Sequence, residues 1–423
     1  MFLSTSFAIL VVFSFIVYRY FKYSSSIIER DATKPRRLPT QWLIGIIWTA
    51  GLGAFHESIA KLKVKYGDLF AIQLGRGRIT VISCTDYVRH ILADRNTYDI
   101  SETTNQKGSS KDGDTLRQAF NDVIKCANRF ALMASIPLWI ARLRLALDSK
   151  FQRALCILRQ YVMHIIHAEQ KRQCEQQQQR VAKPKTLIAS MVAAAENDRL
   201  ETDSSKASLS PTELFDEVSL SMVAGFETTS TALSWFFFFM SKYPDVQAKI
   251  KEELYRHGLT SDAILTLEDL DELVYMECVM KEILRYAPIT AGIVRQATRD
   301  DVINDIIVKK GDIFLIATQN MHRDPRYWKI DPMKFLPERF LDEDKHPTPY
   351  AYMPFGGGHR ACIGQDLALF EFKIAITRLM QRITIEDAGN EANNSGGFIQ
   401  RITCFPKHVA VRVYMDSDAK LPA

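Results

Sequence analysis

The sequence of 423 residues lacks any pair of cysteines in Cys-x-x-Cys spacing. Its seven cysteines are odd in number and scattered along the chain. A disulfide framework needs an even set, and zinc ribbons or fingers need closely spaced ligands, so the pattern argues against both. We therefore expect a reducing compartment in which most of the thiols are inert.

Long basic tracts, internal repeats and an alternation of strand and helix patterns are also missing. The net charge of +5 permits an anionic surface as a partner, but without a basic tract it does not indicate binding to nucleic acid. The hydrophobic share of 47% and the charged share of 24% are typical of a globular protein with a large core. The patterns predict a mainly α fold with small β-sheets.

Charged side chains are absent from the first 18 residues, MFLSTSFAILVVFSFIVY. This stretch approaches the ~20 apolar residues that cross a bilayer. Basic residues follow from Arg19 onward, and the positive-inside rule then places the rest of the chain in the cytosol. We predict a single N-terminal transmembrane helix at 1–23, in preference to a cleaved signal peptide. A basic, proline-containing hinge at 24–40 and one domain at 41–423 follow it.

The longest helical pattern begins at a capping box. Ser210 caps the helix, Glu213 completes the box, and the pattern continues to Tyr243, where Pro244 stops it. Glu227 lies near the centre, and an acidic side chain there would cost about 3 kcal/mol in a bilayer. We therefore predict a long helix buried in a soluble core and not a second membrane span.

One cysteine lies in an unusual stretch, FGGGHRACIG at 355–364. A phosphatase-like loop would need an arginine six positions after Cys362, where Ala368 stands, and a nucleotide loop would need Gly-Lys-Ser/Thr. A Cys–His hydrolase stays open, although no local signature supports it. Thiolate ligation of haem iron needs glycines for close approach and gains from a helix starting just after the cysteine.

The stretch also resembles a known family signature. It fits the pattern Phe-x-x-Gly-x-Arg-x-Cys-x-Gly of the cytochrome P450 family at all five fixed places, which are Phe355, Gly358, Arg360, Cys362 and Gly364. Three further segments resemble the family's oxygen-activation segment, Glu-x-x-Arg helix and meander element, and they come in the family's order: AGFETTS at 224–230, EILR at 282–285 and FLPERF at 335–340. The resemblance extends from about residue 35 to the C-terminus.

The resemblance implies a cofactor, haem b (iron protoporphyrin IX). Cys362 would be the axial ligand of the iron, and Arg360 and Arg295 would pair with the haem propionates. Phe355, Gly358 and Gly364 would complete the cofactor-binding loop.

The same resemblance assigns the two catalytic residues, Thr228 and Glu227. Thr228 would hydrogen-bond the oxygen being activated, and Glu227 would relay protons from solvent. Gly225 would permit a local break in the helix that makes room for oxygen. Taken alone, these residues also fit a buried helix whose hydroxyls bond back to the backbone.

A further helix is predicted over 266–286, and it carries Glu282 and Arg285 one turn apart. Alone, this would be an ordinary surface pair. With Arg339 the two residues are similar to the family's buried ion triad, so we assign them a structural role.

The function implied is that of a monooxygenase that inserts one atom of O2 into a lipophilic small molecule. Its electrons would come from NADPH-cytochrome P450 reductase. The resemblance also implies a single-pass protein of the endoplasmic reticulum membrane with a cytosolic catalytic domain. The alternatives are a truncated, non-catalytic member of the family and a reductase-independent isomerase or dehydratase.

One element of the family is missing from the sequence. Complete members have a Trp-x-x-x-Arg segment ahead of the oxygen-activation helix. Trp139 is the only tryptophan between Cys84 and Gly225, and Leu143 stands where the motif needs arginine. We therefore expect the segment after about residue 101 to be shortened.

Overall fold

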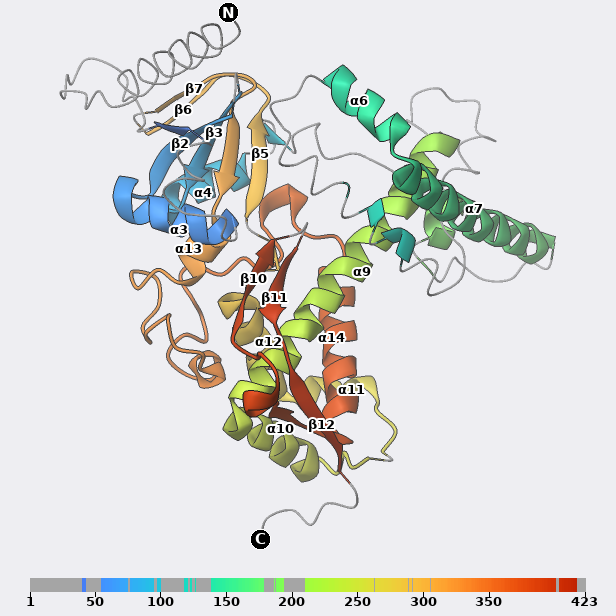
Figure 1. The fold of residues 1–423 in the computed structure, drawn as a ribbon, viewed down its shortest axis with the longest axis vertical. Helices are drawn as coiled ribbons and strands as arrows, with labels where there is room; N and C mark the ends of the chain where they lie inside the picture. Colours follow the sequence, from blue (N-terminus) through green and yellow to red (C-terminus); the bar gives the residue numbers. More distant parts are fainter. Residues whose placement is uncertain are drawn as a thin grey trace, which may run out of the picture. The chain divides into compact units, whose positions relative to one another are not determined.

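The computed structural model describes residues 40–42, 55–74, 77–94, 97–99, 118–120, 122–123, 126, 138–178, 186, 188–193, 210–261, 263–287, 289–290, 292–304, 306–400 and 403–416. These residues are mainly helical with small sheets, as predicted (Figure 1). No helix within them is long and apolar enough to cross a membrane. The anchor predicted at 1–23 and the hinge residues 24–39 lie outside the described part of the chain.

The chain divides into two compact units, which are described separately. The first lies within Met1–Ser101, Gly292–Tyr327 and Thr348–Ala361. The second lies within Glu102–Ala291, Trp328–Pro347 and Cys362–Ala423.

A six-stranded sheet in the order β1-β2-β3-β8-β5-β4 forms the first unit's framework. Its strands are β1 Thr40–Trp42, β2 Leu69–Leu74, β3 Gly77–Ile82, β8 Ile313–Ile316, β5 Ile293–Ala297 and β4 Tyr98–Asp99. β2 and β3 form an antiparallel hairpin, whereas β3 pairs in parallel with β8. The sheet therefore joins an early and a late part of the chain.

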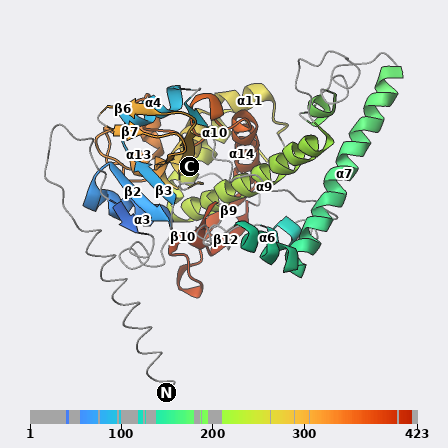
Figure 2. The ribbon, with the colours of Figure 1, turned by 90° about the horizontal axis from the view of Figure 1, so that it is seen from above.

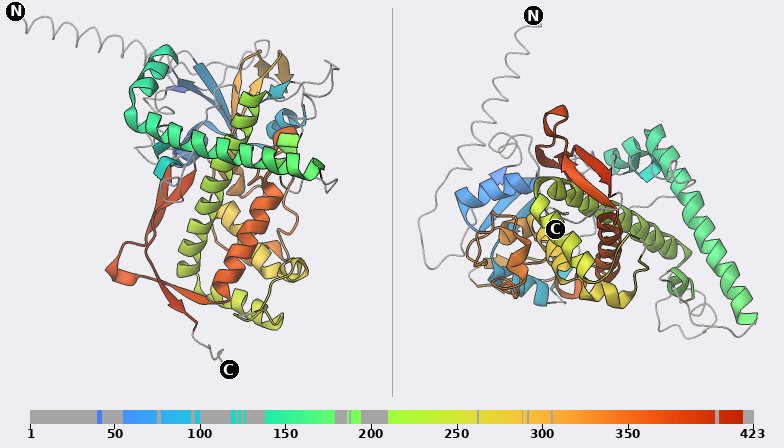
Figure 3. Two further views of the ribbon diagram at one scale, coloured as in Figure 1. Left: turned by 90° about the vertical axis from the view of Figure 1, so that its right-hand side faces the viewer. Right: turned by 90° about the horizontal axis from the view of Figure 1, so that it is seen from below.

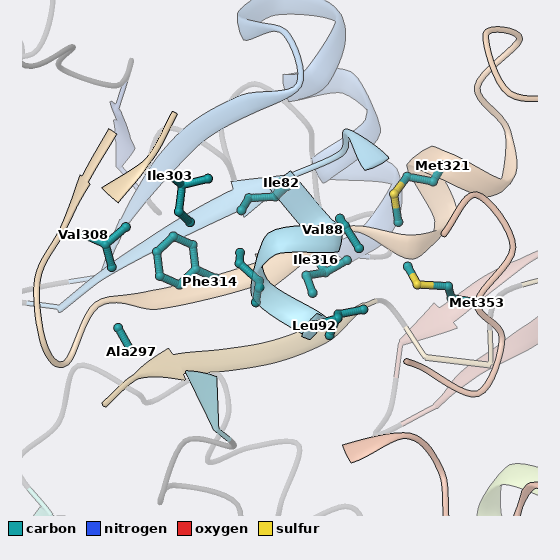
Figure 4. Packing of buried hydrophobic residues seen from close by; sticks show 11 residues of the cluster. Ile82, Val88, Leu92, Ala297, Ile303, Val308, Phe314, Ile316, Met321 and Met353 are labelled. Carbon is teal, nitrogen blue, oxygen red and sulfur yellow. The ribbon is translucent and has the colours of Figure 1, made fainter. Parts of the chain in front are cut away.

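Short elements surround this sheet. They are α3 Phe55–Tyr66, α4 Thr85–Ala93, the hairpin of β6 Asp301–Ile303 and β7 Ile306–Val308, α13 Thr318–His322 and the 3₁₀ turn η3 Gly358–Arg360. Buried side chains of the sheet, including Ile82 and Ile316, pack with Leu92 of α4 (Figure 4). Met353 belongs to the same cluster, so the chain just before η3 is fixed to the core.

The second unit is built around α9, Pro211–Lys242 (Figure 2). Its predicted capping box is present: the backbone N–H of Glu213 donates to Ser210 Oγ at 3.2 Å, and that of Ser210 to Glu213 Oε2 at 2.8 Å. The helix ends at Lys242, just before Pro244, as its sequence pattern predicts.

The other described elements of this unit are helices and two small antiparallel sheets. They are α6 Leu138–Leu147, α7 Ser149–Gln178, α10 Pro244–Arg256, α11 Leu267–Glu272, α12 Val274–Tyr286, η2 Pro337–Phe340, α14 Gln365–Met380, η4 Gly389–Glu391, the two-stranded sheet of β9 Ile383–Asp387 and β12 Val411–Met415, and the hairpin of β10 Gly396–Gln400 and β11 Cys404–His408. Figure 3 shows α14 and the β10–β11 hairpin beside α9, and both contact it.

The single helix predicted over 266–286 is wrong, because the chain is interrupted at Leu273. Glu253 of α10 explains the new start. One of its carboxylate oxygens accepts the backbone N–H of Tyr275 at 2.6 Å and the other that of Met276 at 2.9 Å. A buried carboxylate thus satisfies N–H groups that a continuous helix would have bonded internally.

Candidate functional site

The loop that precedes Cys362 approaches α4 too closely for a side chain at Gly358. This glycine has φ +71°, and a Cβ added to it would lie 2.2 Å from the carbonyl oxygen of Leu92. Gly356 has φ +79° but more room, with its nearest side-chain neighbour, Ile293, at 3.6 Å. Gly358 is therefore required by both backbone conformation and packing.

Arg295 lies beneath the same loop, on β5. It is only 3% exposed, and its guanidinium donates to the carbonyls of Gly357 and Arg360 at 3.4 Å each and to that of Val294 at 2.9 Å. These contacts hold the loop backbone, a role the sequence did not indicate. The propionate contact predicted for Arg295 stays a prediction.

Two other predicted residues lie on the same loop. Arg360 is exposed on η3, and Phe355 is half-buried.

Cys362 belongs to the second unit, where it is exposed just ahead of α14. Its carbonyl accepts the backbone N–H of Gln365, the first residue of the helix, at 3.3 Å. Gly364 occupies the N-cap position and has no side chain to satisfy the first N–H groups. The positive end of a 16-residue helix therefore lies next to Cys362.

Three apolar side chains at this end of α14 are exposed in the part of the chain that the structure describes. Ile363 is 90% exposed, Leu367 59% and Phe370 40%. Contiguous exposed apolar surface is a common feature of binding sites. An exposed sulfur beside it fits haem, because the flat macrocycle would cover the apolar groups while the thiolate holds the iron.

The second candidate segment lies on α9. The local break expected at Gly225 is not observed, since α9 continues as one helix through Pro211–Lys242. Among the described residues, a Cβ at Gly225 would have no neighbour within 4 Å. The Thr228 hydroxyl donates to the carbonyl of Ala224 at 2.8 Å, which is the back-bonding that a helical threonine often makes.

Glu227 points to another side of α9 from Thr228, because neighbouring helical residues are about 100° apart. It is 3% exposed, and its Oε1 lies 3.0 Å from the hydroxyl of Thr403. Thr231 and Trp235 continue the same stripe: the Thr231 hydroxyl contacts that of Thr403 at 2.9 Å, and the Trp235 indole donates to the carbonyl of Cys404 at 2.8 Å. This stripe attaches α9 to β11.

The three residues assigned to a structural triad are brought together and are fully buried. Arg285 donates twice to Glu282, at 2.7 Å each, and Arg339 donates to Glu282 at 3.2 Å. Sequence reasoning missed two partners. Asp344 accepts from Arg339 at 3.1 Å, and the ring of Trp328 lies 5.1 Å from the Arg285 guanidinium and 5.8 Å from that of Arg339.

Thr403 was also missed by sequence reasoning. It is fully buried, and 176 positions separate it from Glu227. No local pattern marks such a residue, because a lone threonine between two hairpin strands has no distinctive spacing.

Comparison with known proteins matches this chain to a family model and to curated relatives. A family model described as "Cytochrome P450" matches residues 105–402. Cytochrome P450 3A13 of Mus musculus is 36% identical over 187 residues, which cover 44% of this chain and 37% of the relative. Cytochrome P450 3A1 of Rattus norvegicus is 35% identical over 207 residues, covering 49% and 40%.

These alignments span well under half the length of the curated relatives. The family model is broader and covers more than half of this chain, including every site segment described above except Thr403. Haem b is the cofactor of that family, which agrees with the residues around Cys362. The chain belongs to the cytochrome P450 family.

Proposed function

We propose that the protein is a haem-thiolate monooxygenase that inserts one oxygen atom from O2 into a lipophilic small molecule, with electrons from NADPH-cytochrome P450 reductase. The observation that carries the proposal is the exposed Cys362 at the N-terminus of α14, beside exposed apolar side chains. When bound, haem supplies the iron at which O2 is activated.

The chain's own residues would hold this group. Cys362 would bind the iron and Arg360 would offer a cation to a propionate. Arg295 holds the carbonyls of Gly357 and Arg360 in the loop before Cys362. Gly358 lets that loop lie directly on α4.

Two residues of α9 would manage protons. Glu227 is buried and can hold a proton out of contact with bulk water. Thr228 is anchored on Ala224, and its oxygen keeps lone pairs free for a further hydrogen bond. A buried acid that can turn toward the neighbouring Thr228 hydroxyl would deliver protons without flooding the site with water.

An apolar substrate class is supported by aromatic residues at the middle of α9. Phe226 is 41% exposed and stacks on Phe120 at 5.3 Å, leaving an apolar surface one position before the acid Glu227. The predicted anchor at 1–23 would place such a protein in the endoplasmic reticulum membrane, where lipophilic compounds concentrate. The hinge at 24–40 and the catalytic domain at 41–423 are part of this proposal.

The test uses the full chain loaded with haem, with reductase, NADPH, isotopically labelled O2 and a set of apolar aromatic and steroid compounds. We expect labelled oxygen in at least one product. Thr228→Ala should keep haem but lower the ratio of product to NADPH consumed. Ser234→Ala removes a comparable hydroxyl, bonded to the carbonyl of Ser230 at 2.8 Å, and should leave that ratio unchanged.

Two other results would refute the proposal. If the protein binds haem but yields no labelled product with any compound, it is a non-catalytic member of the family. The ground for this second candidate is that the sequence has no Trp-x-x-x-Arg segment. Turnover of a peroxide without NADPH would instead indicate an isomerase or dehydratase.

A further inference from the structure

The two-stranded sheet of β9 and β12 has two outer edges, and the chain treats them differently. The outer edge of β9 is covered by Gln247 of α10. The side-chain amide of Gln247 accepts the backbone N–H of Ile385 at 2.8 Å and donates to the carbonyl of the same residue at 2.9 Å. A side chain thus takes the place that a further strand would occupy beside β9.

These bonds also fix the direction of the backbone groups on β12. In an antiparallel pair, opposite residues alternately bond to each other and turn their N–H and carbonyl groups outward. Ile385 turns its groups toward Gln247, so Val413, which lies opposite Ile385, turns its own groups to the far side of β12. The N–H of Asp416 bonds to the carbonyl of Arg382 at 2.7 Å, three positions further along, as this alternation requires.

The outer edge of β12 is open. Val411 and Met415 lie two positions from Val413 and therefore turn their backbone groups the same way. Within the part of the chain that the structure describes, the backbone groups of these three residues have no hydrogen-bond partner. Val413 is 50% exposed and Met415 is 70% exposed. The strand VRVYM contains neither the lysine nor the proline that commonly protects an edge from strand addition.

We propose that β12 is the contact surface for a second copy of this chain. The two β12 strands pair antiparallel about a two-fold axis at Val413, which lies opposite Val413 of the second copy. Val411 then lies opposite Met415 of the second copy, and the reverse. Every outward N–H and carbonyl group of these residues finds a partner across the axis, and the sheet continues through both copies.

The side chains fit the same pairing. On one face of the joined strands, the valines and methionine of β12 meet their own kind. On the other face, Arg412 comes opposite Tyr414 of the second copy, so no like charges face each other. Asp416, at the end of the strand, is already paired with Lys251. Because the contact uses the same surface on both copies, it closes at a dimer.

Disulfide trapping tests the register in the full chain, held in detergent and mildly oxidised. Val413→Cys should form a covalent dimer, because bonded opposite residues have Cα atoms about 5.5 Å apart, within the reach of a disulfide. Met415→Cys is the matched control. Position 415 is more exposed than Val413, yet it lies opposite Val411 and not opposite itself, so this variant should not link to its own kind. A mixture of Met415→Cys and Val411→Cys chains should link.

The native thiols Cys156 and Cys362 are also exposed, so the unaltered chain, oxidised in parallel, gives the background. Cross-linking of Met415→Cys alone as complete as that of Val413→Cys would show random collision and overturn the proposal.

A second variant tests the association itself. Val413→Pro removes an outward N–H and places a ring where the second strand would pair, but it breaks no bond between β12 and β9. Sedimentation over a concentration series should show a dimer of the unaltered chain and its loss in Val413→Pro, with thermal unfolding to show that the variant is folded. A monomer at every concentration, or equal dimer in Val413→Pro, would overturn the proposal. None of these measurements depends on haem, so their outcome is separate from that of the proposed function.

Discussion

Gly358 and Gly364 occupy fixed places of one sequence signature for different physical reasons. Gly358 has a positive φ and no room for a Cβ beside the Leu92 carbonyl. In the described part of the chain nothing lies within 4 Å of a Cβ position at Gly364, so the packing of those residues does not require a glycine there. The signature requires glycine at both positions. The structure shows a physical reason for it only at Gly358, where the loop lies against α4.

Replacing Gly358 with alanine should weaken the loop strongly. The left-handed conformation alone costs an L-residue about 1–2 kcal/mol, and the 2.2 Å contact forces the backbone apart. We expect a lower melting temperature and faster haem loss. Gly364→Ala should leave the stability of the haem-free protein unchanged. Equal stability of the two haem-free variants would contradict this account.

Glu227 shows where prediction from sequence reaches its limit. Its burial and its place beside Thr228 follow from the long helical pattern. Its partner Thr403 lies 176 positions away, and only the paired strands β10 and β11 bring it near. Contacts between residues distant in sequence are set by tertiary packing, which no local pattern encodes.

Among the elements, α9 was predicted to within one residue, because its signals are local: a capping box and a proline. The helix predicted over 266–286 failed at Leu273, because the signal is not local. Glu253 of α10 supplies the carboxylate that starts α12. The pattern of apolar residues over 266–286 cannot show that a residue of another helix caps the start of α12.

Glu253→Ala should destabilise the protein by about 1–3 kcal/mol, because two buried N–H groups at the start of α12 lose their acceptor. Glu252→Ala is the control, since the Glu252 side chain on the same helix is 65% exposed. It should change the free energy of unfolding by less than about 0.5 kcal/mol. Chemical denaturation of both variants measures the difference, and similar values would count against the capping role.

At the scale of the whole molecule, the mainly α class with small sheets follows from composition and helical patterns. The pairing of β3 with β8 does not, since Ile79–Ile82 and Ile313–Ile316 are adjacent only in space. Ion pairs in the first unit likewise join residues that are distant in the sequence and adjacent only in space. Asp324 accepts from Lys63 at 2.5 Å and Arg326 at 2.6 Å, and Arg326 also donates to Asp68 at 2.7 Å.

This network makes the stability of the first unit sensitive to acid. Burial alone would raise the pKa of Asp324, but hydrogen bonds from Arg326 and Lys63 outweigh it and hold the pKa at about 2, below the ordinary 3.8. A depressed carboxyl pKa adds stability that is complete above pH 3.8 and is lost as the pH falls toward 2. Asp324→Asn should therefore lower the melting temperature at neutral pH, and the difference should shrink with acidification through this range. A difference independent of pH would refute the assignment.

The central claim is that Cys362 binds haem iron, and one spectrum tests it most directly. The purified chain is loaded with haem, reduced under carbon monoxide, and compared with Cys362→Ser and Cys156→Ser. Cys156 is also exposed, but on α7. We predict a red-shifted Soret band, typical of thiolate ligation, in the unaltered protein and in Cys156→Ser, and its loss in Cys362→Ser. A band of the same position and intensity in Cys362→Ser would contradict the account.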